Sequence, residues 1–404
     1  MANELFDPLY GADRVAGVLD GGAWIAALLE VELALTNAAA DAGVVDERDA
    51  DAVEPAFGAI RVGPAELGAE AVEGGNPVIP LVRRLRAAVE KVRDGAGRAV
   101  HPGATSQDVM DTALVLLTRR AGSRVVEDLR GSADAAAALA AAHRDTPCAA
   151  RTLGQQALPT TFGAVAASWC SGLDRAAARL AGLLEELPVQ FGGAAGTLAA
   201  SHPHGPAVAD GLAARLGLAP QGVPWHTERT RIGELAGALG VAAGACAKPA
   251  TDVVLLSGTE LGEVSEAAPG DSSSMPHKRN PIAAVTARAS ARRAPGLVAT
   301  LLASMEQEHQ RAAGAWHAEW VTLADLLRAS SGAASRLRSC LEGLSVHPDA
   351  MARNLALTAG DHDAPHHAGD LVDRVLAGRG PGGPRVPAGQ GSGGTGQAPA
   401  EGSR

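Results

Sequence analysis

The 404-residue sequence has few aromatic residues and few cysteines. Aromatic side chains make up 2% of it, and none of the four cysteines has the C-x-x-C spacing of zinc and redox sites. Cys148, Cys170, Cys246 and Cys340 stand in apolar or helical surroundings, which predicts small core residues. The sequence therefore gives no indication of a zinc centre or a redox pair.

A basic excess and a long apolar run are also absent. The net charge is −10 at pH 7, which argues against nucleic acid or an anionic membrane as the main partner. The first residues lack a basic segment followed by an apolar one, and no unbroken run of about 18 apolar residues follows. We expect a cytoplasmic protein with no signal peptide, no membrane partner and no nucleic-acid partner.

Small residues and helical periodicity are abundant instead. Hydrophobic residues make up 46% of the chain, with alanine and glycine frequent, and thin side chains let helices pack closely. Residues 232–256 carry apolar side chains at 3,4 spacing, and helices are also predicted near 24–42 and 79–92. No strand-like alternation of similar length is present. We predict an all-α fold with a bundle of long helices across residues 111–344.

The segment 270–281, GDSSSMPHKRNP, has the chemistry to bind an anion. It packs hydroxyls, potentially cationic side chains and an amide between a glycine and two prolines, and the prolines prevent a regular helix. Such a loop could cradle carboxylates, and a serine desolvated beside cations could act as a base. The alternative is a surface loop with chance basic residues.

Two further segments could contact a ligand. Residues 101–108, HPGATSQD, indicate a glycine turn that leads into a helix capped by Thr105 or Ser106. Such a helix start is either an ordinary cap or an anion site. Residues 151–163, RTLGQQALPTTFG, form the other segment.

These three segments resemble signature elements of the fumarase/aspartase superfamily. The first resembles GSSxMPxKxNP, with Asp271 in place of the leading glycine. The resemblance implies that Ser272 is the catalytic base. It also implies that Lys278, a catalytic residue, and Asn280 hold a substrate carboxylate. Ser273 and Met275 would contact the substrate.

The other two segments resemble the superfamily elements HxGxTSxD and RTHxQxAxPxTxG. The first implies that Thr105 and Ser106 bind a carboxylate, with His101 beside them as a catalytic residue. The second implies substrate-binding roles for a further set of residues: Arg151, Thr152 and Gln155. Leu153 stands where fumarases and adenylosuccinate lyases have a histidine, and leucine cannot transfer a proton. The branches that rely on that histidine are therefore disfavoured.

Two stretches favour one branch of the superfamily. Residues 75–82, GNPVIPLV, and residues 316–320, WHAEW, resemble the carboxymuconate cycloisomerases. That branch implies lactonisation of a small polycarboxylate in the protocatechuate part of the β-ketoadipate pathway. It also makes His317 a substrate-binding residue, with a buried structural histidine as the alternative. Trp316 and Trp320 are interpreted as core residues.

The resemblance also implies an assembly and a domain plan. Superfamily members are homotetramers whose active sites combine segments of three chains, and they need no metal or organic cofactor. We expect an N-terminal helical domain over 1–100 and a central bundle over 101–345. Residues 346–377 are interpreted as the remnant of a truncated C-terminal helical domain. Residues 378–404, rich in glycine and proline, are predicted to be a disordered tail.

Two alternatives to a cycloisomerase stay open at this point. One is another superfamily lyase, which would eliminate fumarate or a related acid from a succinyl-type substrate. The other is a non-catalytic paralogue, which Asp271 and the short C-terminal region favour and the otherwise matching 272–280 segment opposes.

Overall fold

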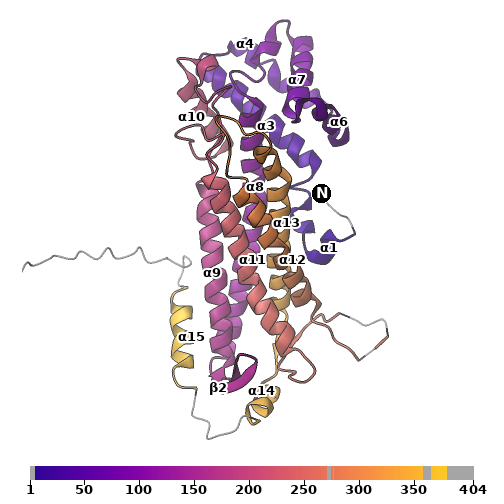
Figure 1. Cartoon of the computed structure of the whole chain (residues 1–404), viewed down its shortest axis with the longest axis vertical. Coiled ribbons are helices and arrows are strands. Elements are labelled where there is room, and N and C mark those ends of the chain that lie inside the picture. The colour runs from indigo at the N-terminus through magenta and orange to yellow at the C-terminus, as the bar shows by residue number, and fades with distance from the viewer. Residues whose placement is uncertain (1–4, 271–273, 276, 358–364, 380–404) are drawn as a thin grey trace, which may run out of the picture.

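A computed structural model describes residues 5–270, 274–275, 277–357 and 365–379 of the chain. The described part is helical with two small two-stranded sheets, so the predicted all-α class is confirmed. Five long helices run side by side and form an elongated bundle (Figure 1). They are α8 (Ser106–Ala142), α9 (Phe162–Glu185), α11 (Thr230–Leu256), α12 (Ile282–Ala303) and α13 (Ala315–Glu342).

Short helices gather at one end of the bundle and along its side. Those that precede the bundle are α1 (Asp7–Tyr10), α2 (Asp13–Ala16), α3 (Gly21–Asp41), α4 (Glu47–Ala50), α5 (Val53–Ala59), α6 (Pro64–Gly74) and α7 (Val78–Val92). Helix α10 (Gly205–Leu216) packs against α3 at the same end (Figure 1). The helices predicted near 24–42 and 79–92 are thus confirmed as α3 and α7.

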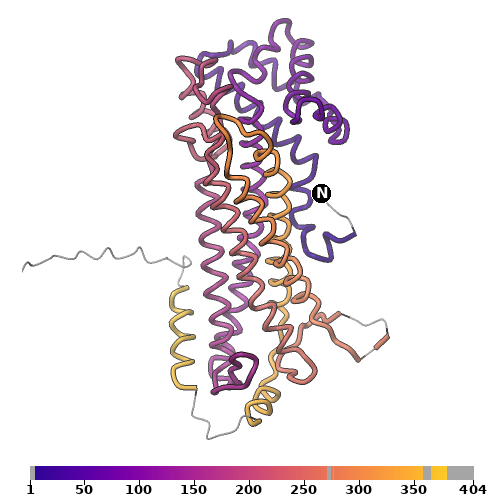
Figure 2. The backbone as a smooth tube through the Cα atoms, in the orientation of Figure 1, coloured from indigo at the N-terminus to yellow at the C-terminus, as the bar shows by residue number. Residues whose placement is uncertain are grey.

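The opposite end carries the strands and the last helices. Strand β1 (Pro147–Thr152) pairs antiparallel with β2 (Gln155–Thr161), and β3 (Val264–Glu266) pairs antiparallel with β4 (Leu344–Val346). Helix α14 (Pro348–Leu355) packs on β1, and α15 (Ala368–Ala377) packs along α9 (Figure 2). The prediction of long helices across residues 111–344 did not include the β1–β2 hairpin that separates α8 from α9. The predicted tail lies almost wholly outside the described residues.

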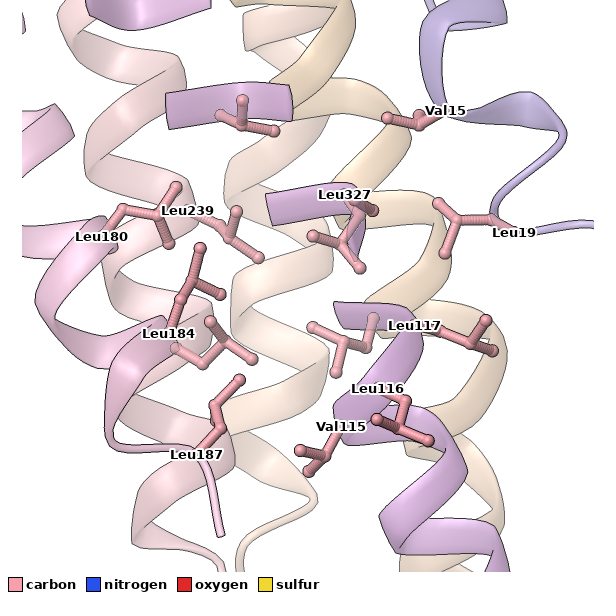
Figure 3. Packing of buried hydrophobic residues seen from close by; sticks show 14 of the residues in the cluster. Val15, Leu19, Val115, Leu116, Leu117, Leu180, Leu184, Leu187, Leu239 and Leu327 are labelled. Atoms are coloured by element: carbon pink, nitrogen blue, oxygen red, sulfur yellow. The ribbon is translucent and has the colours of Figure 1, made fainter. Parts of the chain in front are cut away.

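The bundle is held together by an apolar core along its whole length. Leucines of four long helices meet there, together with residues of the N-terminal segment (Figure 3). The residues drawn include Leu117 of α8, Leu180 and Leu184 of α9, Leu239 of α11 and Leu327 of α13. All four cysteines are buried, as predicted.

Glycine allows a close helix approach in this core. A Cβ atom on Gly122 of α8 would lie 2.8 Å from Cδ2 of Leu184 on α9. Alanine at this position would therefore require the Leu184 side chain to shift. The composition predicted that small side chains would let helices pack closely, and Gly122 is an example.

Helix α11 is the one described helix long and apolar enough to cross a membrane by length and composition. In this fold it packs against α9, α12 and α13, and Leu235, Leu239 and Val253 on it are buried in the bundle. Packing in the bundle therefore accounts for much of its apolar character.

Candidate active site

The first candidate segment forms a turn that leads into α8. His101 has a φ of 61° and Gly103 a φ of 71°, so both adopt the left-handed conformation. A Cβ atom on Gly103 would lie 2.1 Å from Oγ of Ser201, so only glycine fits there. Thr105 is the N-cap of α8 and Ser106 its first residue, as the sequence predicted. The start of this 37-residue helix directs free backbone N–H groups and the positive end of its dipole towards the turn.

Asp108 fixes the geometry of this turn. Its buried carboxylate accepts hydrogen bonds from the backbone N–H groups of Thr105, Gly192 and Gly193, each at 2.9 Å. Nε2 of the buried His226 lies 2.6 Å from its Oδ1 atom. The aspartate of the HxGxTSxD element therefore ties two distant loops to the start of α8 rather than facing a ligand.

His101 is held from the side of the N-terminal helices. Its Nδ1 atom lies 2.7 Å from Oε1 of Glu32 on α3, whose side chain is completely buried. Burial acts to lower the pKa of His101, and the Glu32 carboxylate outweighs it, so the pKa lies above its usual value. Glu32 was missed at the sequence level. The sequence does place Glu32 four residues after Leu28 and three before Leu35, a spacing that puts an acid on the buried face of α3.

His317 lies at the same end of the molecule. It is exposed on the first turn of α13, so the alternative of a buried structural histidine is wrong. A Cβ atom on Gly75 would lie 3.6 Å from its Nε2 atom, which places it beside the α6–α7 turn. Trp316 donates a hydrogen bond from Nε1 to Asp111 of α8 at 3.0 Å and is buried, as its interpretation as a core residue required.

A buried ionic network supports this end of the bundle. The Arg229 guanidinium donates to Oδ2 of Asp111 at 2.8 Å and, from Nε, to Oε1 of Glu319 at 3.0 Å. All three side chains are fully buried. Burial raises the pKa of the Glu319 carboxyl against the opposing effect of Arg229. Gln307, in the segment before α13, also donates to Glu319, at 2.9 Å. The network thus joins α8, the start of α11 and α13, which are distant in the sequence.

The hairpin segment lies at the other end of the bundle. Arg151 on β1 forms two hydrogen bonds to the buried Glu263, at 3.0 and 2.5 Å. Thr152 and Gln155 are exposed at the hairpin tip. Between them Leu153 and Gly154 have φ values of 52° and 79°, the pattern of a tight hairpin turn, and the Leu153 side chain is fully exposed.

The 270–281 segment also follows the far end of α11. Gly270 and Asn280 exchange backbone hydrogen bonds at 2.9 and 3.2 Å, which close the base of the loop. The backbone N–H of Lys278 donates to the backbone carbonyl oxygen of Met275 at 3.0 Å. The side chains of both residues are exposed. Ser272 and Ser273 lie outside the described residues.

The candidate residues therefore form two groups that one chain cannot bring together. His101, Thr105, Ser106 and His317 lie at the start of α8, while Arg151 follows its end (Figure 1). A 37-residue helix is about 55 Å long at ~1.5 Å per residue. Lys278 is likewise separated from the first group. Arg229, the N-cap of α11, contacts Asp111 in the first turns of α8, and the 27 residues of α11 lie between Arg229 and the 270–281 segment.

Comparison with known proteins identifies the family of this chain. The sequence profile of a lyase family matches residues 9–296 of the chain. The chain belongs to the fumarase/aspartase superfamily. A 3-carboxy-cis,cis-muconate cycloisomerase from Pseudomonas aeruginosa is 45% identical over 89% of this chain and 79% of that protein. A nitrosuccinate lyase from Streptomyces davaonensis is 42% identical over 88% of this chain and 77% of that protein.

The solved structures agree with the fold. The crystal structure of 3-carboxy-cis,cis-muconate lactonizing enzyme from Pseudomonas putida superposes with a TM-score of 0.84 at 39% identity. The match covers 93% of this chain and 87% of that one.

Within the described residues, no group of three His, Cys, Asp or Glu side chains is placed to hold a metal ion.

Proposed function

We propose that this chain is a 3-carboxy-cis,cis-muconate cycloisomerase, which closes one carboxylate of its substrate onto a double bond to give 4-carboxymuconolactone. The main support is its similarity to cycloisomerases from Pseudomonas aeruginosa and Bradyrhizobium diazoefficiens, at 45% and 44% identity over most of each chain. The reaction is an isomerisation, so no atom is lost. One C–O bond forms, the π bond of the attacked C=C breaks, and one proton adds to the carbon beside another carboxylate.

The candidate residues suit the charge that this reaction develops. The intermediate is an aci-carboxylate, whose negative charge spreads onto carboxylate oxygens, and preorganised cations and N–H groups stabilise it. Lys278 and Asn280 supply such groups from one chain. The backbone N–H groups at the start of α8, with Thr105 and Ser106, supply them from another. Ser272 donates the proton during lactonisation and acts as the base in the reverse direction.

The hairpin contributes polar groups and one apolar side chain. Because the Arg151 guanidinium is already paired with Glu263, we assign it the role of fixing the hairpin. Thr152 and Gln155 then present substrate contacts. Leu153 at the fully exposed tip offers no proton, so a mechanism that requires a histidine at that position is disfavoured.

We also propose that the chain acts in the cytoplasm as a homotetramer. The separation of the two groups supports active sites that are shared between chains. Large apolar side chains are exposed on the outer faces of the bundle helices, including Val241 and Leu255 of α11 (each 61%) and Val321 of α13 (61%). Such side chains are typical of contacts between subunits.

Sedimentation with an activity assay on each fraction is expected to place all turnover in the tetramer. An active monomer would rule out the shared site.

Nitrosuccinate lyase is the second candidate function, since the Streptomyces relative is nearly as similar to this chain as the cycloisomerases are. The purified protein should be given 3-carboxy-cis,cis-muconate and nitrosuccinate in separate assays. We expect loss of the diene ultraviolet absorbance with the first and no release of fumarate from the second. Turnover of nitrosuccinate alone would transfer the assignment to that reaction, and a folded protein inert to both would be a non-catalytic paralogue.

A further inference from the structure

We propose that Glu32 is a positioning residue for the reaction, which orients the His101 ring and keeps it cationic in the substrate site. This inference rests on the proposed function, and it adds a residue of α3, in a part of the chain where the sequence motifs place none. Three features of the structure carry it: the contact with His101, an unpaired buried oxygen, and the backbone conformation of His101.

The contact fixes which nitrogen of the histidine is free. Nδ1 lies 2.7 Å from Oε1 of Glu32, and Nε2 has no hydrogen-bond partner among the described residues. The histidine side chain is 13% exposed, whereas that of Glu32 is completely buried. A charged imidazole therefore donates one N–H to Glu32 and has the other left for a substrate carboxylate.

The second feature is the incomplete pairing of Glu32 itself. Its Oε2 atom is buried and has no hydrogen-bond partner. A buried carboxylate with one oxygen unpaired is costly, and among the described residues its charged partner at hydrogen-bond distance is His101. The fold retains this carboxylate on the apolar face of α3, between the positions of Leu28 and Leu35. Such local costs are typical of groups kept for function rather than for stability.

The third feature is backbone strain at the histidine. His101 adopts a φ of 61°, which is unfavourable for a residue with a Cβ atom. The neighbouring glycine turn and the anchored start of α8 hold it there. In this backbone conformation the His101 ring contacts the buried Glu32. The turn and the ion pair therefore act together to set the position of the ring.

Three charged groups act on the His101 ring. Glu32 of α3 and Asp108 of α8 favour the imidazolium, while Arg86 of α7 opposes it. Asp108 is already bound by three backbone N–H groups and by His226, so Glu32 is the dominant favourable group. Removal of its charge leaves burial and Arg86 to lower the pKa of His101.

The test is the pH profile of kcat/KM for Glu32→Gln, which keeps the shape and an acceptor oxygen but removes the charge. The alkaline limb, where the cationic histidine is lost, is expected to move to lower pH by ~1–2 units. At pH values above the wild-type limb kcat/KM should then fall by about 10–100-fold, with a smaller loss at pH 6. Glu30→Gln is the matched control, because Glu30 lies on the same helix in an exposed pair with Arg120, and it should leave the profile unchanged.

Two more variants separate positioning from simple structural support. Glu32→Asp keeps the charge and should restore the alkaline limb at least in part. In a His101→Asn background, Glu32→Gln should have almost no further effect on kcat/KM, because it acts through the histidine.

Two results would overturn the inference. One is a Glu32→Gln enzyme that loses activity equally at all pH values. The other is full additivity with His101→Asn. If the wild type turns over nitrosuccinate instead of 3-carboxymuconate, the proposed function fails and the same profile is measured with nitrosuccinate, so the two failures are distinguishable. A chain inert to both substrates contradicts both proposals.

Discussion

Ser272→Ala is expected to lower kcat for 3-carboxymuconate by ~10²–10⁴-fold, the usual contribution of a general acid or base. Alanine removes only the hydroxyl group that donates the proton, while Lys278 and Asn280 still bind the carboxylates. KM should therefore change much less than kcat. The measurement is the steady-state rate of diene absorbance loss.

Ser274→Ala in the same loop is the matched control, since neither the motif nor the proposed mechanism assigns that serine a proton. Its kcat should stay within a few-fold of the wild type. The proton donor would have to be sought elsewhere if Ser272→Ala kept at least a tenth of wild-type kcat.

Arg229→Met is expected to destabilise the folded protein by ~3–5 kcal/mol, as for other buried ion pairs that lose one partner. Without the guanidinium, the buried carboxylates of Asp111 and Glu319 face each other uncompensated. The pKa of the Glu319 carboxyl, already raised by burial, then rises further in the folded protein, so the destabilisation should be largest at pH 8 and smaller at pH 5, where protonation relieves the repulsion. Urea unfolding at the two pH values measures this difference.

Arg231→Met provides the comparison for this network. Arg231 lies two residues further along and is paired with Glu228 at the surface, so its loss should cost at most about 1 kcal/mol. Equal unfolding midpoints for the two variants would mean that the Arg229 network does not support the bundle as described.

Several helices could be predicted because their signal is local. Regular apolar spacing predicted α3, α7 and α11, and the glycine turn with Thr105 predicted the start of α8. The β1–β2 hairpin was missed because Pro147, Pro159 and a shift in register between Ala149 and Arg151 interrupt any alternation.

The support of the candidate site could not be predicted in the same way. Arg229, Asp111 and Glu319 lie more than 80 residues apart, so their contact depends on how α8, α11 and α13 pack. Glu32 shows a weak signal as an acid on an apolar helix face, but its partner 69 residues away is visible only in the fold. Motifs predicted the residues that we propose to face the substrate, and packing showed which residues hold them in place.

The most direct test of a lactonising site shared between chains is a mixture of two inactive variants. His101→Asn and Lys278→Ala chains should each lose nearly all turnover of 3-carboxymuconate. When they are co-expressed with different affinity tags and the mixed tetramers are isolated, about one quarter of the sites should combine an intact His101 with an intact Lys278, by random assembly of the two chains. Turnover, measured as loss of diene absorbance, is expected to recover to roughly that fraction of the wild-type rate. Mixed tetramers as inactive as either parent would contradict a site shared between chains.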